Sequence, residues 1–183
     1  PDALRSFKKA IKYAGSDLDD ILYQIGTSYI QIGEISKAVY YFERAVTVNK
    51  KNELAIYDLG FFYDQLGKYK KSLKFYNKYL DLDPFNYTVW FNLGTVLNKL
   101  DKHDKAIEAY EFAMAINDNF HMALFNIANA LANAEKFEEA VIKYKEYLEI
   151  EPENDDAHCY IGECYLNLED HLLSELYYRK ALE

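Results

Sequence analysis

One interval of 34 residues constrains this chain more than any other feature of its sequence. Small residues recur at that interval through five units, namely Gly26, Gly60, Gly94, Ala128 and Gly162. A second set of small residues keeps the same step, and an aromatic residue follows each member after four positions: Phe42, Tyr76, Tyr110, Tyr144 and Tyr178. A fixed interval of this length is typical of a repeat protein, in which each repeat is one supersecondary unit.

Each repeat predicts two amphipathic helices. In residues 87–120, apolar side chains follow a helical period in two stretches, and the polar segment 101–104 separates them. Two antiparallel helices approach closely where one of them offers a small residue, so we expect Gly94 to face Ala106 and Tyr110. Glycine in a helix costs about 1 kcal/mol relative to alanine, which packing must offset. One hairpin cannot bury this apolar surface alone, so neighbouring hairpins are expected to stack.

The same unit resembles the tetratricopeptide repeat (TPR) in its landmark residues, which are Trp90, Leu93, Gly94, Ala106, Tyr110 and Ala113. Pro84 and Pro152 match the closing proline of that family, whereas Asp118 stands in its place in the third repeat. The resemblance implies an all-α fold, a right-handed superhelical solenoid of antiparallel helix hairpins. It also implies a concave groove, lined by the first helix of each repeat, in which such proteins hold a peptide.

The register divides the chain into a single solenoid with a truncated repeat at the start. The predicted repeats are 19–52, 53–86, 87–120, 121–154 and an incomplete 155–183, and residues 1–18 supply the second helix of a preceding unit. Turns are expected near Gly33, Gly67, Asp101, Glu135 and Glu169, and the two glycines suit helix C-caps. Because the chain starts at Pro1 in the middle of a repeat, we interpret it as a fragment of a longer chain, whose other parts could carry a targeting signal.

Composition narrows the classes of partner and compartment. The net charge of −9 disfavours nucleic acid and fits a basic protein or peptide better. No apolar run reaches 18 residues, so no membrane insertion is predicted. Cys159 and Cys164 lie five residues apart on one predicted helix and point different ways, which disfavours a disulfide. A reducing compartment, and hence a cytoplasmic location, is the resulting prediction.

Charge is unevenly distributed along the chain. Seven lysines and three acids between Lys50 and Lys78 give +4, whereas thirteen acids and three bases between Glu135 and Glu175 give −10. Lys71, Lys74 and Lys78 share one helix face, which is either a solvated stripe or a contact for an acidic partner. A homo-oligomer is a further expectation, formed through these opposite charges or through the truncated ends.

The face of each first helix opposite the core is the predicted peptide-binding groove. Amides dominate it, and an amide can donate to and accept from a peptide backbone at once. The residues assigned to this groove are Gln31, Tyr57, Phe61, Gln65, Phe91, Asn92, Thr95, Lys99, Phe125, Asn126, Asn129 and Asn133. A plain solvated helix face is the alternative for the amides, and packing between adjacent first helices is the alternative for Tyr57, Phe91 and Phe125.

Phe61 is a separate case, because it lies on the arc furthest from the core where neighbouring repeats have threonine or asparagine. Its apolar surface favours a ligand contact. Family members that clamp a chaperone's C-terminal carboxylate place Lys, Arg and Asn in this groove, and here the matching positions are Tyr23, Thr27, Phe61, Phe91 and Thr95. The resemblance therefore does not extend to that clamp.

No catalytic, cofactor or metal site is predicted. The four histidines have no ligand or catalytic spacing, and we expect His158 to fill a core position. We also find no nucleophile elbow or glycine-rich phosphate loop. The leading hypothesis is a non-catalytic protein-protein interaction module. The alternatives are a structural or self-association spacer and a substrate-presenting accessory domain of a larger enzyme, since fold alone does not choose among them.

Overall fold

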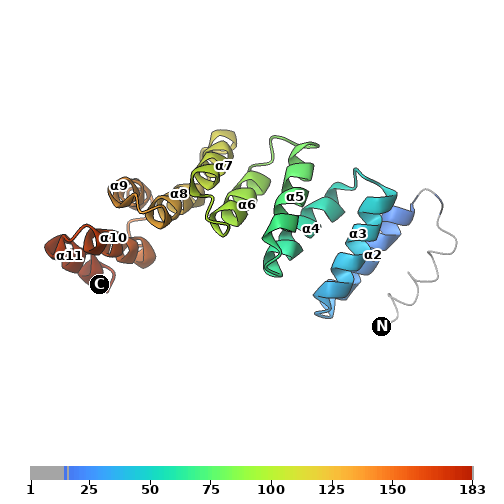
Figure 1. Cartoon of the computed structure of the whole chain (residues 1–183), viewed down its shortest axis with the longest axis horizontal. Helices are drawn as coiled ribbons and strands as arrows, with labels where there is room; N and C mark the ends of the chain where they lie inside the picture. Colours follow the sequence, from blue (N-terminus) through green and yellow to red (C-terminus); the bar gives the residue numbers. More distant parts are fainter. Residues whose placement is uncertain (1–14, 16, 183) are drawn as a thin grey trace. The chain divides into compact units, whose positions relative to one another are not determined.

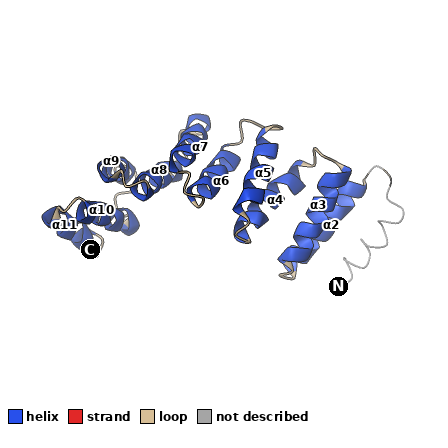
Figure 2. Ribbon diagram, in the orientation of Figure 1, coloured by secondary structure: helices blue, strands red, loops and turns tan. Residues whose placement is uncertain are grey.

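The computed structural model describes residue 15 and residues 17–182, and these residues are entirely helical apart from turns and loops (Figure 2). The helices are α2 (Leu18–Gln31), α3 (Ile35–Val48), α4 (Glu53–Gln65), α5 (Tyr69–Leu80), α6 (Tyr87–Asn98), α7 (His103–Ile116), α8 (Met122–Asn133), α9 (Phe137–Leu148), α10 (Asp155–Asn167) and α11 (His171–Lys180). The predicted all-α fold of sequential helix hairpins is confirmed. The helix predicted for residues 1–18 lies, apart from residues 15, 17 and 18, outside the described residues.

The helices pack as consecutive hairpins, α2 with α3, α4 with α5, and so on to α10 with α11 (Figure 1). Two compact units divide after Pro84. In the first unit, α3 also packs on α4; in the second, α7 packs on α8 and α9 on α10. Each hairpin thus shares its apolar side with the next one within its unit, as stacking requires.

The small residue of each first helix makes room for the aromatic ring of the second helix. A Cβ atom at Gly60 would lie 2.6 Å from the Tyr76 ring, and one at Gly94 would lie 2.7 Å from Tyr110 and 3.1 Å from the Ala106 carbonyl oxygen. Both tyrosines are fully buried. The predicted contact of Gly94 with Ala106 and Tyr110 is therefore confirmed, and the rings occupy the space that a side chain would need.

The turn inside every hairpin contains one residue in the left-handed region. Gly33 and Gly67 have φ of 76° and 66°, while Asp101, Glu135 and Glu169 have φ of 55°, 59° and 60°. In each turn, the next backbone N–H donates to a carbonyl five residues earlier, as in a Schellman motif. These bonds run from Glu34 to Tyr29, Lys68 to Tyr63, Lys102 to Leu97, Lys136 to Leu131 and Asp170 to Tyr165.

Asparagine side chains begin three of the first helices. Asn52, Asn86 and Asn154 accept hydrogen bonds from the backbone N–H groups of the third residue that follows each of them. Such caps satisfy a backbone donor that the helix cannot. Asn52 also joins two hairpins, because its Nδ2 donates to the buried Asp19 carboxylate at 2.9 Å. The Asn49 Nδ2 also donates to the Asp19 carboxylate, at 2.7 Å. The hydrogen bond from Asn52 is the main cause that lowers the pKa of Asp19.

Candidate peptide-binding faces

The outward faces of the first helices form two candidate surfaces, one in each unit. We define the acidic-aromatic face as the side of α2 and α4 in the first unit that carries Asp20, Gln24, Thr27, Gln31, Leu54, Tyr57, Asp58, Phe61 and Gln65. We define the amide face as the side of α6, α8 and α10 in the second unit that carries Phe91, Asn92, Thr95, Lys99, Phe125, Asn126, Asn129, Asn133 and Tyr160.

On the acidic-aromatic face, Phe61 keeps 39% of its surface exposed. Its ring meets the neighbouring Phe62 edge-on, with centroids 5.1 Å apart. Tyr57 is half-buried and lies edge-on to Tyr76 and Tyr79, at 6.4 and 5.9 Å. Phe61 therefore offers ring surface to solvent, as predicted, while Tyr57 is held by the second helix of its own hairpin.

Asp58 lies on the same outer arc of its repeat as Phe61 but is not among the residues assigned to the groove from the sequence. Its side chain is half-buried, and the Tyr23 hydroxyl donates a hydrogen bond to its carboxylate. Burial nevertheless raises the pKa of Asp58, because desolvation outweighs that one bond. The signal was present in the alignment of the repeats, since Asp58 stands where the first, third and fourth repeats have the neutral Gln24, Asn92 and Asn126.

On the amide face, two polar residues are held by tyrosines of the second helices. The Tyr144 hydroxyl donates to Asn129 Oδ1 at 2.5 Å, and the Tyr110 hydroxyl donates to Thr95 Oγ1 at 3.3 Å. Both pairs are 15 residues apart, so the same contact recurs one repeat later. The repeat pattern of the sequence does not indicate these pairs, which fix the orientation of Thr95 and Asn129 toward the hairpin.

Asn126 differs in how its amide is used. Its Nδ2 donates to the Met122 carbonyl oxygen at 2.9 Å, one turn earlier on α8. Within the part of the chain that the structure describes, Asn126 Oδ1 accepts no hydrogen bond. The residue is half-buried, so this oxygen lies on the face as an acceptor of fixed orientation.

Asn133, Asn92 and Lys99 complete the polar part of the amide face. Asn133 Nδ2 lies 3.5 Å from Asn98 Oδ1, which links the ends of α8 and α6, and His103 Nδ1 is 2.7 Å from the same oxygen. Asn92 is half-buried on α6, and Lys99 is exposed at the C-cap of that helix. These contacts show that α6 and α8 present their polar sides to the same surface.

The aromatic residues of the amide face pack mainly on the second helices. Phe91 lies 5.4 Å from the Tyr110 ring and 5.0 Å from Phe120. Phe125 lies 5.7 Å from Tyr144, 5.1 Å from Tyr147 and 5.9 Å from Tyr160. Only the last of these Phe125 contacts joins two first helices, so the expected packing between adjacent first helices holds in part. Tyr160 is 37% exposed and extends the aromatic surface onto α10.

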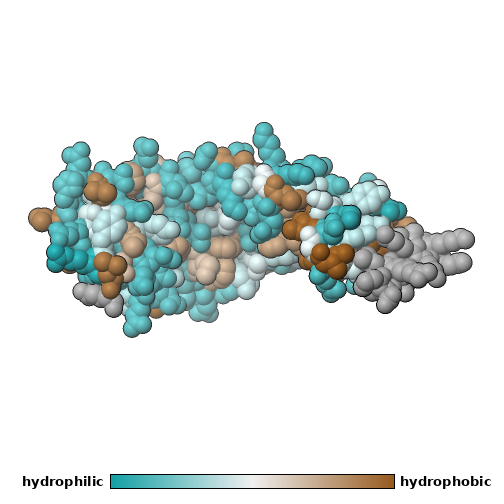
Figure 3. All heavy atoms as spheres, turned by 90° about the horizontal axis from the view of Figure 1, so that it is seen from below, coloured by the Kyte–Doolittle hydropathy of each residue, from teal (hydrophilic) through white to brown (hydrophobic). Residues whose placement is uncertain are grey.

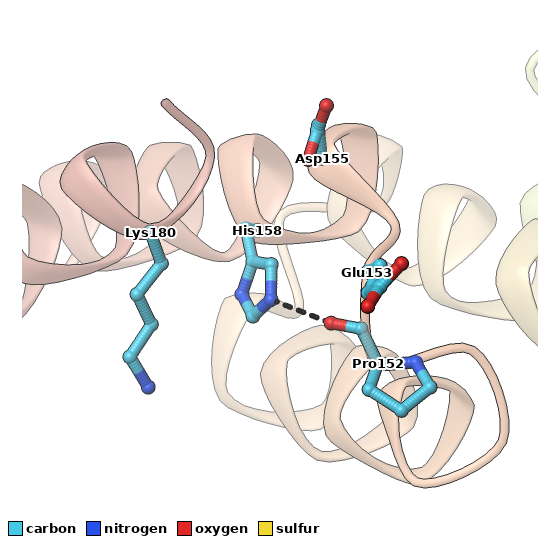
Figure 4. Close-up of a pocket in the computed structure, with 5 residues that line it drawn as sticks. All are labelled: Pro152, Glu153, Asp155, His158 and Lys180. Carbon is cyan, nitrogen blue, oxygen red and sulfur yellow. Dashed lines mark hydrogen bonds between the residues drawn. The ribbon is translucent and has the colours of Figure 1, made fainter. Parts of the chain in front are cut away.

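A third candidate surrounds His158 at the turn between α9 and α10 (Figure 4). Pro152, Glu153, Asp155, His158 and Lys180 line an open pocket of about 750 Å³. His158 Nε2 lies 3.2 Å from the Pro152 carbonyl oxygen, Lys180 lies on the other side of the ring, and Asp155 points away from it (Figure 4). His158 is half-buried rather than a core residue, because its ring reaches out to that turn. The pocket lacks the convergent groups of a catalytic site.

Other features bear on chemistry and compartment. In the described ranges, no three His, Cys, Asp or Glu side chains are arranged to hold a metal ion. Cys159 and Cys164 are both free thiols, and burial raises the pKa of Cys164 to about 11. Every helix within those ranges is too short or too polar to cross a bilayer. On the face seen in Figure 3, hydrophobic side chains form small groups among hydrophilic ones.

These hairpins define a class of α-helical repeat protein, and comparison with known proteins identifies it. Models of the tetratricopeptide repeat match residues 19–52, 55–86, 87–120, 121–154 and 156–183. The chain belongs to the tetratricopeptide repeat family, whose members are protein-interaction scaffolds and typically not catalytic. No curated protein matches the sequence.

Several solved structures share the fold. A MamA protein is 21% identical with a TM-score of 0.84, and the alignment covers 92% of each chain. MamA from Desulfovibrio magneticus RS-1 is 20% identical with a TM-score of 0.82, covering 90% of this chain and 93% of the other. YrrB, a TPR protein described as having an unusual peptide-binding site, is 25% identical with a TM-score of 0.79. The alignment covers 96% of this chain and 90% of the YrrB chain.

Proposed function

We propose that this chain is a non-catalytic binding module that holds a peptide segment or helix of another protein on the first-helix faces of its repeats. The observation that carries the proposal is the arrangement around Asn126. Its Oδ1 is an acceptor, on a half-buried residue, that belongs to a face whose neighbouring Asn129 and Phe125 are fixed by Tyr144. A prearranged acceptor beside aromatic surface suits an extended backbone, because fewer groups must be ordered on binding.

The similarity to YrrB supports the proposal, since that protein is described as peptide-binding and shares the fold over most of both chains. A location in the cytoplasm is part of the same proposal and rests on the two free thiols. The exposed ring of Phe61 offers the first unit a corresponding apolar contact.

The test is to select short peptides from a phage-displayed library on the intact chain and to measure their affinities by calorimetry. For peptides bound to the amide face, Asn126→Ala should weaken binding by about 1 to 3 kcal/mol, because a desolvated ligand donor loses its acceptor. For peptides bound to the other face, Phe61→Ala should have the comparable effect.

Asn77→Ala is the matched control. Asn77 on α5 donates to the Leu73 carbonyl oxygen at 2.8 Å, the same bond to the preceding turn that Asn126 makes at 2.9 Å. Both substitutions remove one such bond, so they should change stability alike and differ only in binding. If the selected peptides bind Asn126→Ala and Phe61→Ala as tightly as the unchanged chain, the assignment of these faces is wrong.

A further inference from the structure

The proposed function leaves open which peptides the first unit prefers, and Asp58 bears on that choice. At this position of the repeat, Gln24, Asn92 and Asn126 each offer a neutral amide that both donates and accepts. Asp58 offers a carboxylate, which in its ionised form only accepts. A ligand that suits the amides therefore does not automatically suit the first unit.

The Asp58 carboxylate is only partly satisfied by the chain. Tyr23 on α2 donates one hydrogen bond to it. Within residues 17–182, no lysine or arginine pairs with it. A half-buried carboxylate has room for several donors, and the raised pKa of Asp58 indicates that the present environment disfavours its charge. An incoming cation would offset that cost.

The surroundings of Asp58 also favour a cation. The acidic-aromatic face holds Asp20 and Asp58, and none of its residues is basic. The lysines that follow it in the chain lie instead on the second helix α5, including Lys70, Lys74 and Lys78. Phe61, one turn from Asp58 on α4, exposes part of its ring, and an ammonium or guanidinium group is attracted to an aromatic face.

We propose that the acidic-aromatic face recognises a basic side chain, lysine or arginine, of a partner peptide, with Asp58 as its charge partner and Phe61 as the ring beside it. This inference rests on the proposed function and adds the chemistry of the ligand in the first unit. The occupant is thus a peptide with at least one basic residue. The charge of that residue pairs with Asp58 on α4, and its side chain contacts the Phe61 ring one turn further along the same helix.

The decisive variant is Asp58→Asn, because asparagine is the residue that the chain itself uses at positions 92 and 126. The probes are library-selected peptides, each paired with a version whose Lys and Arg residues are replaced by Gln. Asp58→Asn should weaken binding of a basic peptide about 10- to 100-fold, the range for loss of a charge-assisted bond. The same substitution should leave the affinity for the Gln version unchanged. A higher salt concentration should weaken binding of the basic peptide and not of the Gln version.

Two controls separate recognition from structure. Asp81→Asn removes one charge at the C-cap of α5 in the same unit and should leave affinity unchanged. The thermal midpoint of Asp58→Asn should be equal to or above that of the unchanged chain, because a raised pKa means that the charge opposes folding at neutral pH. A lower midpoint would show that Asp58 is structural and would overturn the inference.

The outcomes also distinguish this inference from the function beneath it. If Asp58→Asn binds basic peptides normally while Phe61→Ala or Asn126→Ala weakens binding, the faces bind peptides but Asp58 does not select the cation. If none of the three substitutions affects any selected peptide, the proposed function fails as well. Equal affinity of the unchanged chain for the basic and Gln versions would overturn the charge preference directly.

Discussion

In the second repeat, Asp58 and Phe61 occupy two successive positions on the outer face of α4; in the fourth repeat, the same two positions on α8 are Asn126 and Asn129. The rings behind them are equivalent, because Tyr76 and Tyr144 are both buried second-helix tyrosines. Tyr144 donates to Asn129, whereas Phe61 offers no acceptor at that place. One backbone arrangement and one buried ring can therefore support either a charged aromatic surface or a polar amide surface.

A similar contrast separates the turns of the two units. The first unit places Gly33 and Gly67 at the left-handed position, and the second places Asp101, Glu135 and Glu169 there. Residues with a Cβ atom pay about 1 to 2 kcal/mol in that conformation. The second unit therefore tolerates a local cost that the first unit avoids.

The largest expected effect tests whether aromatic residues on the two faces have different roles. Phe125→Ala should lower the free energy of unfolding by about 2 to 4 kcal/mol, because its ring packs against Tyr144, Tyr147 and Tyr160. Phe61→Ala should cost under about 1 kcal/mol, since this residue is 39% exposed. Urea titration followed by circular dichroism measures both. Equal losses would mean that Phe61 is a packing residue and would remove it from the proposed site.

The next effect concerns how tightly each hairpin encloses its small residue. Gly60→Ala should destabilise the chain by about 1 to 3 kcal/mol, because the new Cβ would lie 2.6 Å from the fully buried Tyr76 ring. In Gly162→Ala the closest approach is 3.0 Å to Tyr178, whose ring is only half-buried and can move. The gain in helix propensity of about 1 kcal/mol should then leave that variant close to neutral.

Ala128 shows that alanine is accepted at this position in the fourth repeat, where it is fully buried. Because the ring beside Gly60 is closer and more deeply buried than the ring beside Gly162, the thermal midpoint of Gly60→Ala should be lower than that of Gly162→Ala. The same midpoint for both would show that the ring can shift equally in the two units and that close contact at Gly60 carries no special cost.

The smallest expected effect uses the turns. Glu135→Gly should raise the free energy of unfolding by about 0.5 to 1 kcal/mol. Glycine adopts the φ of 59° without steric strain, and the relief of that strain should exceed the entropic cost of a more flexible unfolded chain. The reciprocal change, Gly67→Ala, should lower it by about 1 kcal/mol. Denaturant midpoints of the two variants test this, and a loss of stability in Glu135→Gly would indicate that its side chain contributes more than its backbone costs.

Much of the fold could be predicted from the sequence, because each landmark depends on contacts within one hairpin. Gly94 facing Tyr110 and the turn at Gly67 require only the helical period and the steric properties of glycine. The candidate faces could be located in the same way, since a residue opposite the core on a first helix stays there in every repeat. The behaviour of each side chain was harder to predict, as Phe125 shows by packing on rings from two other helices.

The sequence by itself determined the repeat length, the order of helices and which residues lie on the outer faces, because these follow from local periodicity. Only the tertiary structure decided which polar groups are already satisfied, since that depends on residues far apart along the chain. The Tyr23 hydroxyl lies 35 positions before Asp58 and the Tyr144 hydroxyl 15 positions after Asn129, and both distances are closed by packing between helices.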